Sequence, residues 1–182
     1  NTTDEAAAYV VLCYGLIADI YLRETNAYLE LTYVRIWETP DDLFNEESPL
    51  GEFRQWWNQN MQDVPRNLAQ FFSGRRNLPY GGAAYLAGIC RGHGYSVMGY
   101  LLGFTGDVTR PDVFNYDVHV AAHEIGHNCG TGHTHDSYNP PIDGCGNGDC
   151  TDANLGTIMS YCHLCSGGLS NMAMEFHPEV QL

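Results

Sequence analysis

The hydrophobic pattern at the start of the chain predicts a long helix. Apolar residues recur through segment 4–26 at the spacing of a single helix face. They are Tyr9, Leu12, Cys13, Leu16, Ile17 and Ile20. Gly15 and Asp19 interrupt the apolar-rich stretch 6–22, so it falls short of the roughly 18 apolar residues that a membrane span needs. The pattern therefore predicts a buried helix and no membrane insertion.

The next segment changes to a period of two. Leu29, Leu31 and Tyr33 alternate with the other face within segment 27–38, which predicts a strand. A polar, turn-rich stretch over 39–49 then predicts a loop.

Residues 50–74 predict a second helix, beginning at about Gly51. Pro65 lies inside this stretch and either kinks the helix or divides it into two helical pieces. Glycines punctuate segment 77–103, which predicts short β-like pieces.

A third helix is predicted in the second half of the chain. It starts at Asn115 or Asp117 and ends near Gly130, where the helical pattern stops at a glycine. The chain is then almost all loop as far as Gly156. Its last part predicts a tight turn and a short final helix that ends near Pro178.

Composition limits the class of protein. A length of 182 residues with 44% hydrophobic residues suits one domain with one sizeable core, and no repeat or linker divides it. The net charge is −14, and all eight basic residues are arginines. Such a surface argues against nucleic acid and anionic membranes as partners. The chain opens on Asn-Thr-Thr-Asp-Glu, without the pattern of a signal peptide, which favours a processed form.

Seven cysteines indicate an oxidising compartment, and therefore secretion. Because the number is odd, at least one thiol is free or pairs with another chain. Cys145 and Cys150 bracket a glycine-rich loop, and a disulfide between them is expected to staple it. Cys13 and Cys129 are the candidates for a buried thiol or an unusual bridge.

Four of the eight histidines fall within residues 121–136. His123 and His127 are four apart, so on a helix both imidazoles lie on one face and can bind one metal ion. Gly130 permits the left-handed turn that brings His133 back to the same ion.

This constellation predicts a catalytic zinc site. Three neutral imidazoles leave a tetrahedral zinc ion with one open position for water, whose pKa the zinc lowers. Glu124 stands beside His123, where it can take the proton of that water and pass it to a leaving amine. The alternative is a structural zinc site closed by a fourth ligand, for which His135 and Asp136 are available.

The extended pattern His-Glu-x-x-His-x-x-Gly-x-x-His resembles the zinc motif of the metzincin endopeptidases. Met159, in "GTIMSYC" 26 residues beyond His133, resembles their Met-turn, in which the methionine forms a hydrophobic floor beneath the zinc. The segments "GGAAYLAGICRGHGYSVMG" and "HEIGHNCGTGH" are most similar to the adamalysin/reprolysin group. The resemblance covers roughly Leu29 to Tyr161.

Two departures from that group stand out. Thr134 and His135 intervene before Asp136, where adamalysins have the aspartate directly after the third histidine. Tyr161 follows Met159 by two positions, as does the tyrosine of astacins and serralysins that can ligate zinc. Zinc ligation, oxyanion stabilisation and simple packing all remain open for Tyr161.

The resemblance implies an α/β (α+β) catalytic domain over 1–182, with an upper subdomain of about 1–130 and a lower one of about 131–182. The fold has a twisted, mostly parallel sheet with an antiparallel edge strand, long helices, the zinc helix at the cleft and a loop-rich C-terminal part. A substrate would lie along the edge segment, Gly82, Ala83, Ala84, Tyr85 and Leu86, and segment 160–171 would wall the specificity pocket. Cys90 would bond to Cys162 or Cys165.

These observations favour a secreted, monomeric zinc endopeptidase that acts on proteins or peptides, with a propeptide expected upstream. The rival classes are a catalytically silent binding module with the same fold and a zinc amidase or deacetylase acting on a small substrate. A calcium ion is a weaker expectation. Its ligands would come from Asp143, Asn147, Asp149 and Asp152, although a solvated loop suits their spacing better.

Overall fold

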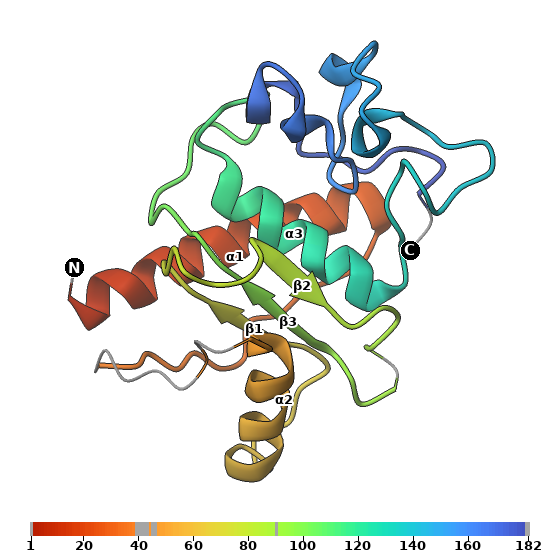
Figure 1. Ribbon diagram of the computed structural model, residues 1–182. Coiled ribbons are helices and arrows are strands. Elements are labelled where there is room, and N and C mark those ends of the chain that lie inside the picture. Colours follow the sequence, from red (N-terminus) through yellow and green to blue (C-terminus); the bar gives the residue numbers. More distant parts are fainter. Residues whose placement is uncertain (1, 39–43, 45–46, 90, 181–182) are drawn as a thin grey trace.

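The computed structural model describes residues 2–38, 44, 47–89 and 91–180. Within them lie three α-helices and three strands: α1 (Thr3–Thr25), α2 (Pro49–Asn60), β1 (Ala69–Phe72), β2 (Gly82–Ala84), β3 (Tyr95–Met98) and α3 (Tyr116–Cys129). Figure 1 shows α1 and α3 on one face of the sheet and α2 on the other, with the C-terminal loops beyond α3. This arrangement is a mixed α+β domain, as the sequence predicts.

The sheet has the order β1-β3-β2. β1 pairs with β3 in parallel, Ala69 opposite Tyr95, and β2 pairs with β3 antiparallel, Gly82 opposite Met98. An antiparallel strand at one edge is therefore present, and it lies on the side where α3 packs.

Hydrophobic residues are buried on both faces of this sheet. On the α2 side, Phe53, Phe71 and Tyr95 belong to an aromatic cluster whose rings meet mostly edge to face. On the other side, the core joins α1 and α3 to the C-terminal loops, and it contains Met98 from β3. The second core carries the helix with the histidines, and so it fixes the candidate site to the sheet.

α1 begins at a capping box, in which Thr2 and Glu5 satisfy each other's backbone N–H groups. By length and composition alone this helix could cross a membrane, contrary to the expectation from its interrupted apolar run. A core helix and a signal sequence meet the same criteria. Only 22% of the 18-residue window that meets them is buried, and one face of α1 packs against α3, where the buried Tyr21 donates a hydrogen bond to the carbonyl of Ala122 at 2.8 Å.

Segment 27–38 is not a strand, and the prediction of one is wrong. No backbone hydrogen bond joins residues 28–38 to another described residue. The alternation of side chains is therefore present without a neighbouring strand that could pair with it. The loop predicted over 39–49 lies largely outside the described residues.

The predicted second helix is also too long. α2 ends at Asn60, and Ala69–Phe72 forms β1 instead. Pro65 removes a backbone donor and disfavours helical geometry in the residue before it. Beyond Pro65 the burial alternates, and Ala69 and Phe71 are buried. This period of two is typical of a strand, but the stretch is only four residues long and was interpreted as part of the helix.

The short final helix is likewise absent from the described C-terminal residues up to 180. The chain instead makes the 3-10 turns Cys162–Leu164 and Gly168–Asn171. Gly167 and Gly168 have φ angles of 106° and 58°, which interrupt any α-helix there.

Candidate active site

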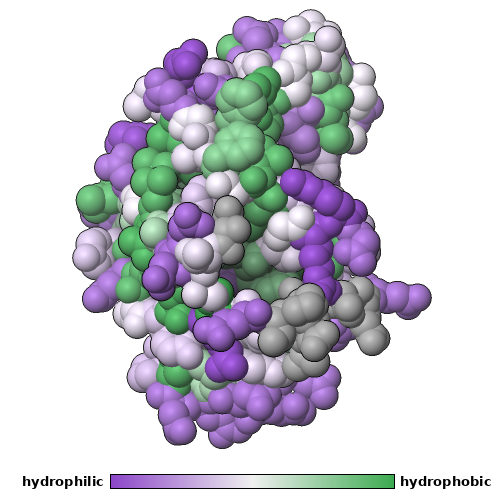
Figure 2. All heavy atoms as spheres, turned by 90° about the vertical axis from the view of Figure 1, so that its left-hand side faces the viewer, coloured by the Kyte–Doolittle hydropathy of each residue, from purple (hydrophilic) through white to green (hydrophobic). Residues whose placement is uncertain are grey.

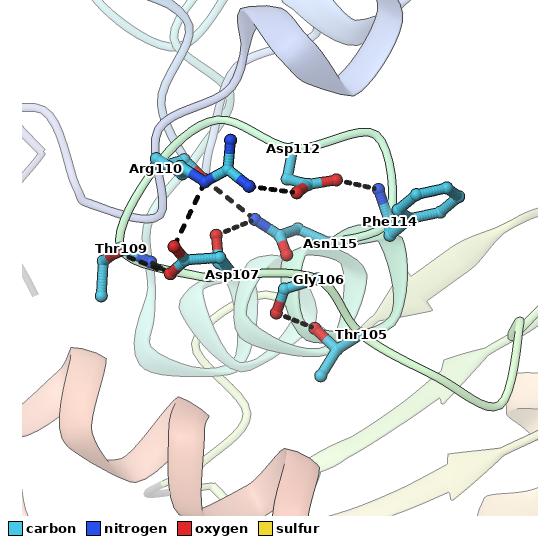
Figure 3. A network of polar contacts seen from close by, with 8 residues as sticks. All are labelled: Thr105, Gly106, Asp107, Thr109, Arg110, Asp112, Phe114 and Asn115. Carbon is cyan, nitrogen blue, oxygen red and sulfur yellow. Dashed lines mark hydrogen bonds and ion pairs between the residues drawn. The ribbon is translucent and has the colours of Figure 1, made fainter.

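The loop that leads into α3 is held by its own polar side chains, as Figure 3 shows. The side-chain amide of Asn115 donates to the carbonyls of Asp107 and Arg110, each at 3.1 Å. The Arg110 guanidinium forms ion pairs with Asp107 and Asp112. These contacts fix where the helix begins, and the predicted start at Asn115 is confirmed.

The first turn of α3 is anchored by the buried carboxylate of Asp117. It accepts hydrogen bonds from the backbone N–H groups of Leu102 and Gly103, and from the hydroxyl of Tyr9 in α1 at 2.6 Å. At the other end, Gly130 takes a φ of 114° and its N–H caps the carbonyls of Gly126 and His127. The predicted glycine stop is thus confirmed.

The turn at Gly130 brings three imidazoles together. The ligand nitrogens of His123, His127 and His133 all lie within 4.8 Å of one another. Nδ1 of His123 faces the carbonyl of Ile158 at 2.7 Å, and Nδ1 of His127 faces that of Thr131 at 2.8 Å. A ring nitrogen that faces a carbonyl carries the proton, so Nε2 of both rings is left with its lone pair.

The cluster fits a zinc ion. Nε2 of His127 and Nε2 of His133 are 3.0 Å apart, close to the roughly 3.4 Å between two nitrogens bound tetrahedrally at about 2.0–2.1 Å. Without a metal the two nitrogens can share one proton in a hydrogen bond, and a zinc ion would take the place of that proton. Burial lowers the pKa of His123 well below its usual value and that of His133 to about 4, so the donors are neutral, as ligation requires.

The predicted Met-turn lies directly against α3. Met159 is fully buried, and a Cβ at Gly126 would lie only 2.6 Å from its sulfur. The backbone N–H of Thr134 donates to the carbonyl of Met159, and the carbonyl of the preceding Ile158 orients His123. The turn therefore packs behind the histidines and also positions one of them.

Glu124 is 4% exposed and lies between the helix and the edge strand. A Cβ at Gly82 would overlap Oε1 of Glu124, so only a glycine lets β2 pass this close. Oε2 has no hydrogen-bond partner among the described residues. Burial without a compensating cation raises the pKa of the carboxyl to about 8.

Tyr161 reaches the same cluster. Its ring centroid is 4.4 Å from that of His133 and 4.7 Å from that of His135. Burial, and to a smaller extent the charges of Glu124 and Asp136, raise the pKa of its hydroxyl. The structure brings Tyr161 to the histidines, and its role stays a prediction.

The buried His135 and the exposed Asp136 extend the cluster beyond His133. The His135 ring stacks on that of His133, with centroids 5.2 Å apart. Asp136 Oδ2 lies 3.8 Å from Nδ1 of His133 and 3.6 Å from Nε2 of His135. These two residues border the third ligand.

Another histidine pair went unnoticed in the sequence. His119 lies one turn before His123 on α3, and its ring is 5.8 Å from that of His163 after the Met-turn. Nε2 of His119 is buried with no partner among the described residues, and burial lowers its pKa to about 3. The four-residue spacing from His123 was the signal available for it.

The predicted disulfide pairing is wrong. Cys145 bonds to Cys162, and Cys150 bonds to Cys165, with Cα–Cα distances of 4.9 and 5.8 Å. Both supposed partners of Cys90 are thus already bonded, and Cys90 itself lies outside the described residues. Spacing along the chain does not determine connectivity. The glycine-rich loop folds onto the segment after the Met-turn instead of closing on itself.

The acidic loop considered for calcium satisfies its own backbone. Asp143 accepts from the N–H of Cys145, Asp149 accepts from Thr151, and the Asn147 amide donates to the carbonyl of His135. Asp152 lines the same hollow of about 150 Å³ as Asp143 and Asp149. Calcium binding at this loop stays a prediction.

The mixed α+β domain brings His123, His127 and Glu124 of α3 together with His133, which lies just after that helix, in a site that could hold a metal ion. A model of the Metallo-peptidase family M12 matches residues 1–172, and the chain belongs to this family. Family membership makes the protein a metalloprotease, with zinc as the implied cofactor and proteins or peptides as the substrate class.

Proposed function

We propose that this protein is a secreted zinc-dependent endopeptidase, with His123, His127 and His133 as zinc ligands and Glu124 as general base. One observation carries the proposal. The three imidazole nitrogens converge within 4.8 Å, and Oε2 of the neighbouring Glu124 is buried with no hydrogen-bond partner among the residues that the structure describes. An unpaired buried carboxylate is costly to stability, which favours a catalytic reason for it.

When bound, zinc acidifies a water molecule and polarises the scissile carbonyl. Glu124 removes a proton from the attacking water and delivers it to the leaving amine. Burial raises the pKa of Glu124, and a zinc ion held by the neighbouring histidines would lower it again, which would leave the carboxylate free to accept the proton.

The substrate would lie extended along segment 82–86. β2 is the sheet edge beside α3, and the buried amide of Asn128 donates to the carbonyls of Tyr85 and Tyr95. The N–H of Ala87 also donates to the carbonyl of His127 at 2.8 Å. These hydrogen bonds fix the position of segment 82–87 relative to α3, the helix that carries His123 and His127. An antiparallel substrate strand would gain main-chain pairing with little sequence preference.

The remaining expectations belong to the same proposal. Segment 160–171 would form a specificity wall, and two disulfides brace it. Those disulfides support secretion. A single catalytic domain with subdomains of about 1–130 and 131–182, a monomeric state and an upstream propeptide complete the proposal.

The test is Glu124→Gln, which keeps size and hydrogen bonding but removes the base. Zinc content by metal analysis and thermal stability should barely change, because the three histidines remain. Hydrolysis of casein should fall by at least about 10²-fold. Glu179→Gln, at an exposed position, is the matched control and should cleave at the parent rate. Near-parental cleavage by zinc-loaded Glu124→Gln would refute the mechanism, and a zinc-loaded parent that cleaves no protein would favour a binding module.

A further inference from the structure

A second pair of histidines lies beside the three-histidine cluster and has no role in the proposed mechanism. His119 is one turn before His123 on α3, and His163 lies in the turn Cys162–Leu164 after the Met-turn. Their ring centroids are 5.8 Å apart, and the ring planes meet at 61°. The two rings are therefore neighbours between α3 and segment 160–171.

Each ring of this pair has a buried nitrogen without a partner. Nε2 of His119 and Nδ1 of His163 are shielded from solvent and make no hydrogen bond to any residue that the structure describes. The whole side chain of His119 is buried, at 4% exposure. A buried polar atom that stays unpaired is costly, so native proteins almost always give it a partner. Two such atoms on neighbouring rings indicate one partner that serves both.

A transition-metal ion fits this pair of rings. Imidazole is a preferred ligand of zinc, copper and nickel. Two imidazoles that share an ion at about 2.0–2.1 Å have ring centroids about 4.5–6.4 Å apart, depending on the angle at the metal. The observed 5.8 Å lies within this range. So do the separations of 4.6 to 5.3 Å within the three-histidine cluster.

We propose that His119 and His163 bind a second zinc ion next to the catalytic one. Nε2 of His119 and Nδ1 of His163 would be its protein ligands, and water would fill the remaining positions. With two protein ligands in place of three, this site should hold zinc more weakly than the three-histidine cluster. The bound ion would join α3 to segment 160–171, and so it would hold the proposed specificity wall in place.

Other parts of the described chain suit a second ion less well. His133, His135 and Asp136 also bring ligand atoms within 4.8 Å of one another. An ion there would compete for the ring of His133, which the proposed function assigns to the catalytic zinc. Figure 2 shows green, hydrophobic residues around a hollow of about 540 Å³ beside segment 30–37, and none of the described residues that line it is a histidine or a cysteine.

Equilibrium dialysis of the zinc-loaded protein against low concentrations of free zinc tests the proposal. The parent should bind two zinc ions per chain. His119→Gln and His163→Gln should keep the first ion, and each should raise the dissociation constant of the second by at least about 10-fold, because loss of a mere supporting partner of a ligand already costs that much. His93→Gln, at a half-buried position outside both groups, is the matched control and should bind two ions.

Anomalous scattering at the zinc edge from a crystal of the parent locates the second ion without any variant. Its peak should lie between the rings of His119 and His163. A parent that binds only one zinc ion, at the three-histidine cluster, would overturn the proposal. So would a second ion that His135→Gln removes and His163→Gln retains, which would assign it to the group around Asp136.

These readouts are independent of peptidase activity. Absence of zinc from the three-histidine cluster would contradict the proposed function and not the second site. The two proposals can therefore fail separately.

Discussion

At the scale of single residues, the three histidines are not held in the same way. Backbone carbonyls face Nδ1 of His123 and His127, whereas the carboxylate nearest to Nδ1 of His133 is that of Asp136, at 3.8 Å. At 3.8 Å the two atoms are beyond hydrogen-bond distance. A small rotation of either side chain would bring Asp136 to the position from which a carboxylate orients a ligating imidazole and raises its basicity.

We expect Asp136→Asn to weaken zinc binding by about 10- to 100-fold, because the third imidazole loses its charged partner. Competition with a chromophoric chelator measures the affinity. Asp152→Asn, at an exposed position in the neighbouring loop, is the control and should leave it unchanged. Equal zinc affinity of Asp136→Asn and the parent would remove Asp136 from the site.

Tyr161→Phe distinguishes the roles open to that hydroxyl. The ring contacts with His133 and His135 remain, so only the O–H group is lost. We expect kcat to fall about 10-fold or more at unchanged zinc affinity, as when an oxyanion donor is removed. A fall in zinc affinity would instead assign ligation, and parental kinetics would assign packing.

At the scale of elements, the contact between β2 and α3 matters most to the site. Because a Cβ at Gly82 would overlap Glu124, any side chain there must displace the carboxylate or the strand. We expect Gly82→Ala to lower kcat/KM for a peptide substrate by about 10²-fold, since a small misplacement of a catalytic group is costly. Zinc content should stay at the parental level.

Gly15→Ala, at an exposed position of α1, is the control for Gly82→Ala. A Cβ at Gly15 would meet nothing within 4 Å, so this variant should cleave the peptide at close to the parental rate. A Gly82→Ala variant with parental kcat/KM would show that β2 and Glu124 need not approach so closely.

The elements that the sequence predicted are those specified by nearby residues. Both helices α1 and α3 follow from a period near four and from their ends, such as the glycine at position 130. The zinc motif could be predicted for the same reason, because His123 and His127 are four residues apart on one helix and therefore share one face. β1 was missed because its residues also suit a helix, and a short strand depends on a partner far away in the chain, here β3.

The disulfides were unpredictable for a related reason. Which cysteines meet depends on how the loop at 145–150 folds over the segment at 162–165, and no local pattern encodes that. The groups that orient the zinc-ligand candidates could not be predicted from the sequence either. The carbonyls of Ile158 and Thr131 orient two histidines, and a carbonyl belongs to every residue type.

At the scale of the whole molecule, the C-terminal part has few regular elements and relies on covalent links. We expect replacement of Cys150 and Cys165 by serine to lower the free energy of unfolding by about 3 kcal/mol, because a loop of about 15 residues is no longer closed in the unfolded chain. Denaturant unfolding measures this, and non-reducing peptide mapping of the parent checks the pairing. A Cys145–Cys150 peptide in that map would contradict the structure.

The backbone carbonyls behind His123 and His127 have a consequence for how this site can evolve. A role performed by the main chain does not depend on the identity of the side chain at Ile158 or Thr131. Both side chains are nevertheless buried, Ile158 completely, so packing restricts which residues can replace them. An alignment of relatives would record that packing, and it would not reveal that the carbonyls at these positions orient two metal ligands.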